Sequence, residues 1–366
     1  MKILISTNDF WNLINFRRPL INELKKKGYE IIILTNMNKK KKNFNKYMGL
    51  KVHHINFKSN FNVINDVINL ISILLIFFKY KPEIVLNFTI KPILLCSLVS
   101  KLFNIKCINT ITGFGNFYLR SKKFELFFVS LYKYFTSNNN YFFFHNKNDL
   151  KFFVNNKISK KTKCFSTMGS GVNLTAFNDL KPKLKKNINF LMISRLIYNK
   201  GVIEFLETVN LFKKKKNLYF ELVGKDPDND LNEIKQSELS KYKDLDNLKI
   251  TNFTSNIKKK LKKTNFVVLP SYREGMPKSL IEAMSSGIPV IASNVAGNSD
   301  LIRENFNGFF CRPKSSKSLY KCILGVSKIK QKRYSKISKN CRDFAENHLN
   351  ENKVTLKYLS LIKKII

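Results

Sequence analysis

Short apolar runs alternate along this chain with longer segments in which apolar residues recur every three or four positions. The first pattern is typical of buried parallel strands, and the second of helices that connect one strand to the next. Two such series occur, and together they predict an α/β protein with two parallel-sheet domains. The expected strands are residues 2–7, 30–35, 52–57, 83–88, 106–111, 141–145 and 163–166 in the first series, and 188–194, 219–224, 248–253, 266–271, 289–293 and 308–312 in the second.

Glycine and proline support the expected helix boundaries. A helix over residues 17–27 would end at Gly28, and one over residues 62–79 would end before Pro82. Glycine commonly follows the last residue of a helix, and proline disfavours helical backbone in the residue before it.

The length of 366 residues suits two domains, each large enough to bury its own core. Residues 179–187 are irregular and lysine-rich, so we expect them to link an N-terminal domain over residues 1–178 to a C-terminal domain over residues 188–345. Residues 346–366 have a helical pattern, and we expect them to pack back toward the N-terminal domain.

The net charge of +41 is the most unusual property of the composition. Such a charge attracts nucleic acid or an anionic membrane, but lysines that merely fill solvated faces explain it equally well. Basic runs at residues 39–42, 213–216 and 258–263 are scattered along the chain, and no nucleic-acid-binding module accompanies them. Nucleic acid is therefore not an expected partner.

Three features of the sequence indicate where in the cell the protein resides. They are the spacing of the cysteines, the first residues and the hydropathy. The six cysteines form no CxxC pair, which favours a reduced cytoplasmic setting without structural zinc. The chain runs from Met1 directly into a strand-like segment and shows no signal-peptide pattern, so export is not expected. The most apolar stretch, residues 67–78, is shorter than the roughly 20 residues that cross a bilayer, and we expect it not to span one.

Residues 270–290 are the strongest candidate for chemistry. An apolar strand ends at Pro270, a polar loop carries Glu274 and Gly275, and Pro277 stands where a helix would begin. Backbone N–H groups at a helix start have no intrahelical acceptor and suit a diphosphate. Glu282 lies on this helix. The alternative is a surface helix with two incidental glutamates.

Arg195 and Lys200 follow the first strand of the second series and precede a helix. Ligands of open parallel sheets bind at the carboxyl ends of the strands, where these two cations are expected. Arginine can contact two phosphate oxygens at once, and lysine acts as a point charge. Fixed cations would stabilise the charge that builds on a departing diphosphate without a metal ion.

These two segments resemble the Glu-x7-Glu and Arg-x4-Lys-Gly motifs of the family-4 retaining glycosyltransferases. The resemblance implies the GT-B fold, in which two Rossmann-like domains face each other across a cleft, and a reaction without metal or cofactor. It also implies that Glu274 contacts the transferred sugar, that Glu282 binds the nucleotide ribose, and that Arg195 and Lys200 neutralise the donor diphosphate. We expect further donor contacts from Gly275, Met276, Pro277, Ser279 and Leu280.

The first series carries weaker candidates. Asn15 and Arg17 follow its first strand, where related enzymes have a flexible loop, although the usual glycine-rich sequence is missing. Gly113 lies in a segment, residues 110–116, that resembles the Gly-x-Gly segment of enzymes building lipid-linked oligosaccharides; a simple tight turn is the alternative. The histidine that many relatives carry near this strand is absent. We expect His145 to be a structural strand residue.

The nearest subgroup by resemblance comprises bacterial transferases that extend undecaprenyl-diphosphate-linked sugars. This implies a UDP-linked N-acetylhexosamine as donor, and a polyprenyl-diphosphate-linked sugar or another glycan as acceptor. Apolar helices near residues 67–78 and 124–135, flanked by lysines, suit either a bilayer interface or the domain core. We expect a cytoplasmic enzyme, with peripheral attachment to the inner face of the plasma membrane as a further expectation.

Two alternatives come from other classes. A non-hydrolysing UDP-sugar 2-epimerase shares this architecture, but it needs several carboxylates and histidines for proton transfer, and the chain has only 4 histidines. A basic nucleic-acid-binding protein would instead bind nucleic acid with a steep salt dependence.

Overall fold

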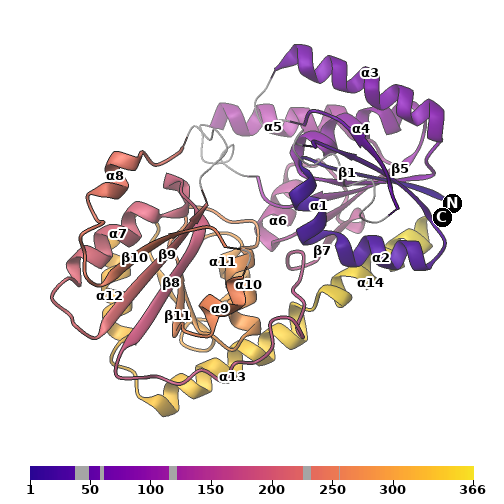
Figure 1. The fold of residues 1–366 in the computed structure, drawn as a ribbon. Coiled ribbons are helices and arrows are strands. Elements are labelled where there is room, and N and C mark those ends of the chain that lie inside the picture. The colour runs from indigo at the N-terminus through magenta and orange to yellow at the C-terminus, as the bar shows by residue number, and fades with distance from the viewer. Residues whose placement is uncertain (38–48, 58–61, 115–121, 226–231, 255) are drawn as a thin grey trace. The chain divides into compact units, whose positions relative to one another are not determined.

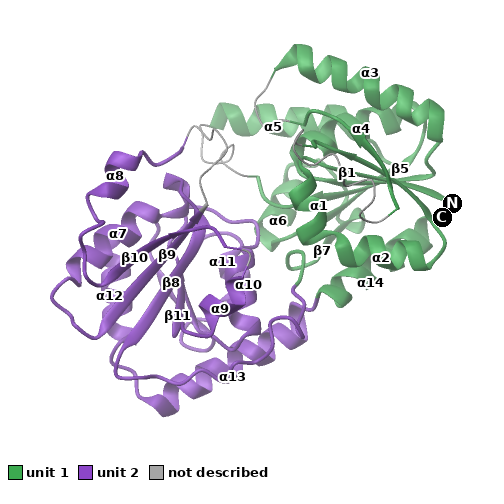
Figure 2. Cartoon of the chain, viewed as in Figure 1, with its two compact units in different colours: residues 1–171, 351–366 green, residues 172–350 purple. Residues whose placement is uncertain are grey.

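The computed structural model describes residues 1–37, 49–57, 62–114, 122–225, 232–254 and 256–366 (Figure 1). It divides into two compact units, residues 1–171 with 351–366 and residues 172–350 (Figure 2). The basic run at residues 39–42 and the end of the Gly-x-Gly segment at residues 115–116 lie outside the described residues.

Unit 1 contains a parallel sheet of seven described strands in the order β3-β2-β1-β4-β5-β6-β7. This order reverses direction between β1 and β4, which are neighbours. The strands are β1 (Lys2–Thr7), β2 (Glu30–Thr35), β3 (Lys51–His54), β4 (Ile84–Phe88), β5 (Lys106–Ile111), β6 (Asn140–Phe144) and β7 (Cys164–Ser166). The helices are α1 (Phe10–Phe16), α2 (Arg18–Lys26), α3 (Val63–Tyr80), α4 (Ile90–Leu102), α5 (Lys122–Phe135), α6 (Lys147–Asn155) and α14 (Glu351–Ile365).

Both faces of this sheet are buried, which explains its continuous apolar strands. Ile3 and Ile5 of β1 point into a core beneath α1, α2 and α14, whereas Leu4 between them points into a second core beneath α3 and α4. Consecutive side chains of a strand alternate between the faces, so a strand covered on both sides needs apolar residues throughout.

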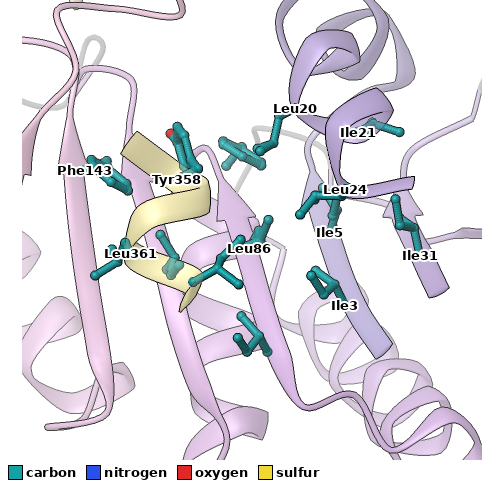
Figure 3. Packing of buried hydrophobic residues seen from close by; sticks show 14 of the residues in the cluster. Ile3, Ile5, Leu20, Ile21, Leu24, Ile31, Leu86, Phe143, Tyr358 and Leu361 are labelled. Carbon is teal, nitrogen blue, oxygen red and sulfur yellow. The ribbon is translucent and has the colours of Figure 1, made fainter. Parts of the chain in front are cut away.

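The last helix, α14, completes the first of these cores. Tyr358 and Leu361 point from α14 onto the sheet, beside Phe143 and Leu86 (Figure 3). The Tyr358 hydroxyl and Thr110 Oγ1 form a hydrogen bond of 2.6 Å at the end of β5. The end of the chain therefore belongs to the same folding unit as its beginning.

Unit 2 repeats the architecture with six described strands in the order β10-β9-β8-β11-β12-β13. The expected and observed strands overlap in every case, and the predicted α/β fold with two parallel sheets is confirmed. The strands are β8 (Ile188–Arg195), β9 (Leu218–Lys225), β10 (Leu248–Asn252), β11 (Phe266–Leu269), β12 (Val290–Ser293) and β13 (Gly308–Cys311). The helices are α7 (Val202–Leu211), α8 (Gln236–Ser240), α9 (Ile257–Leu261), α10 (Lys278–Ser285), α11 (Asn298–Leu301), α12 (Ser316–Val326) and α13 (Gln331–His348).

The division of the chain falls at Gly171, earlier than the expected linker over residues 179–187. The residues after Gly171 are already tied to unit 2. The Leu180 N–H donates to the Ser286 carbonyl at 3.1 Å, and Asn265 Nδ2 donates to the Lys183 carbonyl at 3.0 Å. At the other end, α13 continues to His348, so the final helix begins at Glu351 instead of residue 346.

The helix α3 differs from the expectation for residues 67–78. It is 18 residues long, with a mean hydropathy of 1.7, and by length and composition it could cross a membrane. The helix is longer than the apolar stretch on which that expectation rested, because it also includes residues 63–66 and 79–80. Only one side of α3 enters the core, through Ile73 and Phe77.

Candidate active site

The candidate site of unit 2 lies where the strand order of its sheet reverses. From β8 the chain goes to β9 on one side and later to β11 on the other, and β8 pairs directly with β11. Such a reversal leaves a crevice at the carboxyl ends of the two central strands, which is where open α/β sheets bind ligands. Arg195 is the last residue of β8, and the loop after β11 begins at Pro270.

Lys200 and Glu274 form an ion pair at this point, with Lys200 Nζ 2.6 Å from Glu274 Oε1. The glutamate side chain is 7% exposed and the lysine side chain 22%. A carboxylate this deeply buried requires a partner, and the lysine supplies the opposite charge. The two motifs identified in the sequence thus meet in space.

Gly201 brings the two segments together along their backbones. Its φ of 72° lies in the left-handed region, and a Cβ at this position would be 2.2 Å from the Pro270 carbonyl oxygen. Glycine is the residue that tolerates both conditions. The Tyr272 N–H also donates to the Asn199 carbonyl at 2.9 Å. The Lys200 turn is consequently fixed against the loop that carries Glu274.

Gly297, which the sequence analysis missed, holds the other side of that loop. A Cβ on Gly297 would lie 2.6 Å from the Gly275 carbonyl oxygen and 2.8 Å from that of Glu274, and its φ is 83°. Nearby, the Ser293 hydroxyl donates to the Ser271 carbonyl. The position of Gly297 after the carboxyl end of β12 was the available signal, because neighbouring strand ends share one edge of the sheet.

The helix α10 starts directly after this loop, with Pro277 as its N-cap residue. The Ile281 N–H donates to the Pro277 carbonyl at 3.2 Å. The N–H groups of Ser279 and Leu280 precede that bond and belong to the first turn, whose amides have no acceptor within the helix. The helix dipole adds partial positive charge at the same end.

Glu282 is on the next turn of α10, where burial raises the pKa of its carboxyl to about 7 and nearby Lys278 opposes the shift. This carboxyl group therefore exchanges its proton close to neutral pH. Gly275 and Met276, between Glu274 and the helix, are partly buried.

A further contact behind the loop was not anticipated. The Tyr272 hydroxyl donates to Glu204 Oε1 of α7 at 2.5 Å, and Glu204 is itself buried. Burial and this carboxylate both raise the pKa of Tyr272. Lys314 Nζ lies 5.1 Å from the centre of the tyrosine ring. Together these contacts fix the residue two positions before Glu274.

The weaker candidates Asn15, Arg17 and Gly113 belong to unit 1, and the others to unit 2. Asn15 is exposed, and its Nδ2 donates to the Trp11 carbonyl at 2.8 Å. Gly113 follows β5 with a φ of 126°. Arg17 is buried, with its guanidinium carbon 3.9 Å from the centre of the Phe88 ring.

No cluster of three or more His, Cys, Asp or Glu side chains suited to a metal ion occurs within the described residues.

Comparisons with known proteins decide the family. Residues 175–344 match the family model described as "Glycosyl transferases group 1", and residues 2–146 match "Glycosyl transferase 4-like". The chain is a glycosyltransferase by both of its matched regions. These matches confirm the resemblance inferred from the two motifs.

Two relatives of this glycosyltransferase align with most of the chain. It is 26% identical to the N,N'-diacetylbacillosaminyl-diphospho-undecaprenol alpha-1,3-N-acetylgalactosaminyltransferase of Campylobacter jejuni, over 97% of this chain and 96% of the relative. It is 29% identical to the UDP-Gal:alpha-D-GlcNAc-diphosphoundecaprenol alpha-1,3-galactosyltransferase of Escherichia coli, over 80% of this chain and 78% of the relative.

Solved structures share the fold of this glycosyltransferase over its whole length. A glycosyltransferase from Rickettsia africae is 20% identical, with a TM-score of 0.79, and the match covers 100% of this chain and 98% of the other. HepE of Anabaena, solved in complex with UDP and glucose, is 14% identical, with a TM-score of 0.79 and 100% of both chains covered. The GT-B fold predicted from the resemblance is thereby confirmed.

Proposed function

We propose that this glycosyltransferase moves a hexose-type sugar, an N-acetylhexosamine, from a UDP-sugar to a polyprenyl-diphosphate-linked sugar with retention of configuration. One observation carries the proposal: the Lys200–Glu274 ion pair stands at the sheet reversal of unit 2, directly before the start of α10. Positive charge and helix N–H groups suit the diphosphate of such a donor, and a carboxylate suits its sugar hydroxyls.

In this proposal the residues of the site bind different parts of the donor. Arg195, Lys200 and the first-turn amides of α10 hold the donor diphosphate, and they stabilise it most when the glycosidic bond breaks and negative charge builds on it. The Glu282 carboxylate accepts hydrogen bonds from the ribose hydroxyls. Glu274 faces the sugar, where it accepts hydrogen bonds from sugar hydroxyls and keeps Lys200 oriented.

The ion pair also orients Lys200. The Glu274 carboxylate holds the ammonium in place and compensates its charge. A donor diphosphate would add two negative charges beside the same ammonium. A cation that is already oriented stabilises a leaving group without a reorganisation cost.

The acceptor part of the proposal rests on the relatives. The names of the relatives from C. jejuni and E. coli both describe sugar transfer to a diphospho-undecaprenol-linked sugar. The same chemical class is proposed as the acceptor here, and synthesis of a cell-surface polysaccharide or oligosaccharide as the process.

Attachment to an anionic membrane surface is proposed as part of this function, because a polyprenyl acceptor resides in the bilayer. One side of α3 leaves large apolar side chains exposed, and α5 adds Leu126 and Phe127. Lys79 of α3 and Lys122, Lys123 and Lys133 of α5 accompany them. Exposed apolar residues with flanking lysines match the interior and the anionic headgroups of a leaflet. The exposed residues of α3 are Val63, Ile64, Val67, Ile68, Ile71, Leu75 and Phe78.

The deciding experiment measures UDP release from a panel of UDP-sugars with a synthetic undecaprenyl-diphosphate-linked monosaccharide. The proposal expects release only when both substrates are present, a product one sugar longer, and loss of both in Glu274→Ala with donor binding retained. Conversion of the sugar nucleotide without UDP release would point to a 2-epimerase and overturn the proposal.

A further inference from the structure

Unit 1 has its own sheet reversal, between β1 and β4, and Arg17 lies beside it. Arg17 stands at the junction of α1 and α2, and its backbone serves both helices: its N–H donates to the Leu13 carbonyl, and its carbonyl accepts from Ile21. The guanidinium carbon is 3.9 Å from the ring centre of Phe88, the last residue of β4. The side chain is thus fixed at the place where an open parallel sheet binds ligands.

Arg17 has no carboxylate partner in the part of the chain that the structure describes. The residue is 3% exposed, and its Nε is buried without a hydrogen-bond partner. Burial lowers its pKa, and Tyr358 is the one group that opposes the shift. A guanidinium stays charged in proteins, so a buried one without a carboxylate calls for an anion from outside the chain.

His145 provides a second unsatisfied group in the same region. It follows β6, is 6% exposed, and its Nε2 is buried without a partner. The backbone N–H of His145 donates to the Ile111 carbonyl at 3.1 Å, and this bond fixes the His145 backbone at the end of β5. Burial lowers the pKa of His145, and the charge of Arg17 lowers it further. The imidazole is therefore neutral and can donate one N–H to an anion.

Buried aromatic residues pack around this region. The Tyr358 ring of α14 is 4.4 Å from the Phe143 ring and 6.0 Å from the Phe88 ring, centre to centre. The hydrogen bond between Tyr358 and Thr110 fixes its outer end. In an environment of this kind a charge-assisted hydrogen bond is stronger than in water.

We propose that Arg17 and His145 form a second anion site of this chain, which takes a phosphate group of a substrate diphosphate. The inference deepens the proposed function, on which it rests for the identity of the substrates. The guanidinium would donate to phosphate oxygens, and the His145 imidazole would donate one further hydrogen bond. The sequence analysis assigned Arg17 to the donor and gave His145 no role in binding; here the two act together.

The test is isothermal titration of the full chain with inorganic pyrophosphate, a probe that requires neither sugar nor acceptor. The Lys200→Met/Glu274→Gln variant serves as background, because it removes the ion pair of unit 2 without leaving an unpaired charge. In this background, Arg17→Met should weaken pyrophosphate binding about tenfold or more, and His145→Gln severalfold. Arg18→Met, at the neighbouring exposed arginine, is the matched control and should change binding by less than about twofold.

Unchanged pyrophosphate affinity in Arg17→Met would overturn the second site. Because Arg17 is buried, its replacement by methionine can disturb folding, and thermal unfolding shows whether the variant is folded. If Arg17→Met does not fold, pyrophosphate binding is measured with Arg17→Lys and His145→Gln instead. If every variant that folds binds pyrophosphate as its background does, the proposal fails. Pyrophosphate binding does not involve sugar transfer, so this result does not test the proposed function. The UDP-release assay tests the proposed function separately.

Steady-state kinetics in the otherwise unaltered chain separates the two sources of the phosphate. If the donor supplies it, Arg17→Met raises the KM for the UDP-sugar and the Kd for UDP, and leaves the KM for the acceptor unchanged. If the lipid-linked acceptor supplies it, the acceptor KM rises and UDP binds as before. Unchanged values of all three constants would contradict the proposal.

Discussion

Lys200 Nζ lies 2.6 Å from Glu274 Oε1, although the two residues are 74 positions apart in the chain. Each belongs to a different sequence motif, and each follows a different strand of the same sheet. Their contact joins the ends of β8 and β11 through a pair that is also proposed to handle the substrate.

Removal of one member of this pair should affect both folding and activity. Lys200→Met leaves the buried Glu274 carboxylate without its counter-charge, and we expect the free energy of unfolding to fall by about 2 kcal/mol. The kcat/KM for sugar transfer should fall about 100-fold or more, because the leaving diphosphate loses a cation. Denaturant unfolding and initial rates measure the two effects.

The double variant Lys200→Met/Glu274→Gln supplies the control for stability. It removes both charges, and most of the lost stability should return while activity stays low. Equal stability of Lys200→Met and the unaltered chain would show that the ion pair does not hold the loop.

A methyl group at position 297 should displace the Glu274 loop. Gly297→Ala places its Cβ 2.6 Å from the Gly275 carbonyl oxygen at a φ of 83°. We expect a loss of about 1–3 kcal/mol in the free energy of unfolding, and a lower kcat. Gly325→Ala is the matched control, because α12 contains this glycine and a Cβ there meets nothing within 4 Å. That change should be neutral or stabilise by up to about 1 kcal/mol; similar losses in both variants would contradict the role of Gly297.

The affinity for a UDP-sugar should depend on pH through Glu282. The free carboxyl has a pKa of about 7, raised by burial. Ribose hydroxyls that donate to it favour its ionised form, so its pKa in the complex is lower than in the free protein. The affinity is then full above about pH 7 and declines as the pH falls below it. The diphosphate diester of a UDP-sugar does not titrate in this range.

Titration calorimetry between pH 5.5 and 8.5 would measure this dependence, with Glu282→Gln as its control. The glutamine variant should bind more weakly at high pH, with an affinity that no longer varies. A pH dependence that persists in Glu282→Gln would assign it to another group.

Acidic substitutions on α3 should release the protein from membranes. Ile68 and Leu75 are 55% and 65% exposed. Ile68→Asp/Leu75→Asp should strongly reduce flotation with vesicles of phosphatidylethanolamine and phosphatidylglycerol, because it puts carboxylates against apolar chains and anionic headgroups. Leu211→Asp, at a 57% exposed leucine of unit 2, is the matched control. Equal flotation of the α3 variant and the control, or no flotation of the unaltered chain, would refute membrane attachment through α3.

The sequence predicted the strands well because both faces of each sheet are covered. Continuous apolar runs such as Ile3-Leu4-Ile5 have no solvated face and can be recognised without knowledge of their neighbours. The motifs around Lys200 and Glu274 were recognisable for a different reason, since each combines a strand end, a turn and a helix start within a few residues.

The remaining features depend on contacts between distant segments. The constraint on Gly297 comes from the backbone of Gly275, and the unsatisfied state of His145 from its burial after the end of β6. Neither leaves a local pattern. The exposure of α3 could not be predicted either, because an apolar helix has the same sequence pattern whether it is covered or faces solvent.

The placement of α14 governs when unit 1 can fold during synthesis. Tyr358 and Leu361 complete a core whose buried members outside α14 lie in the first 143 residues, yet they are translated after every residue of unit 2. A nascent chain thus holds a finished unit 2 while the first sheet still lacks one of its covering helices. Proteins usually acquire their domains from the N-terminus onward; in this chain the N-terminal unit is the last to be completed, and removal of the final sixteen residues would leave its apolar surface uncovered.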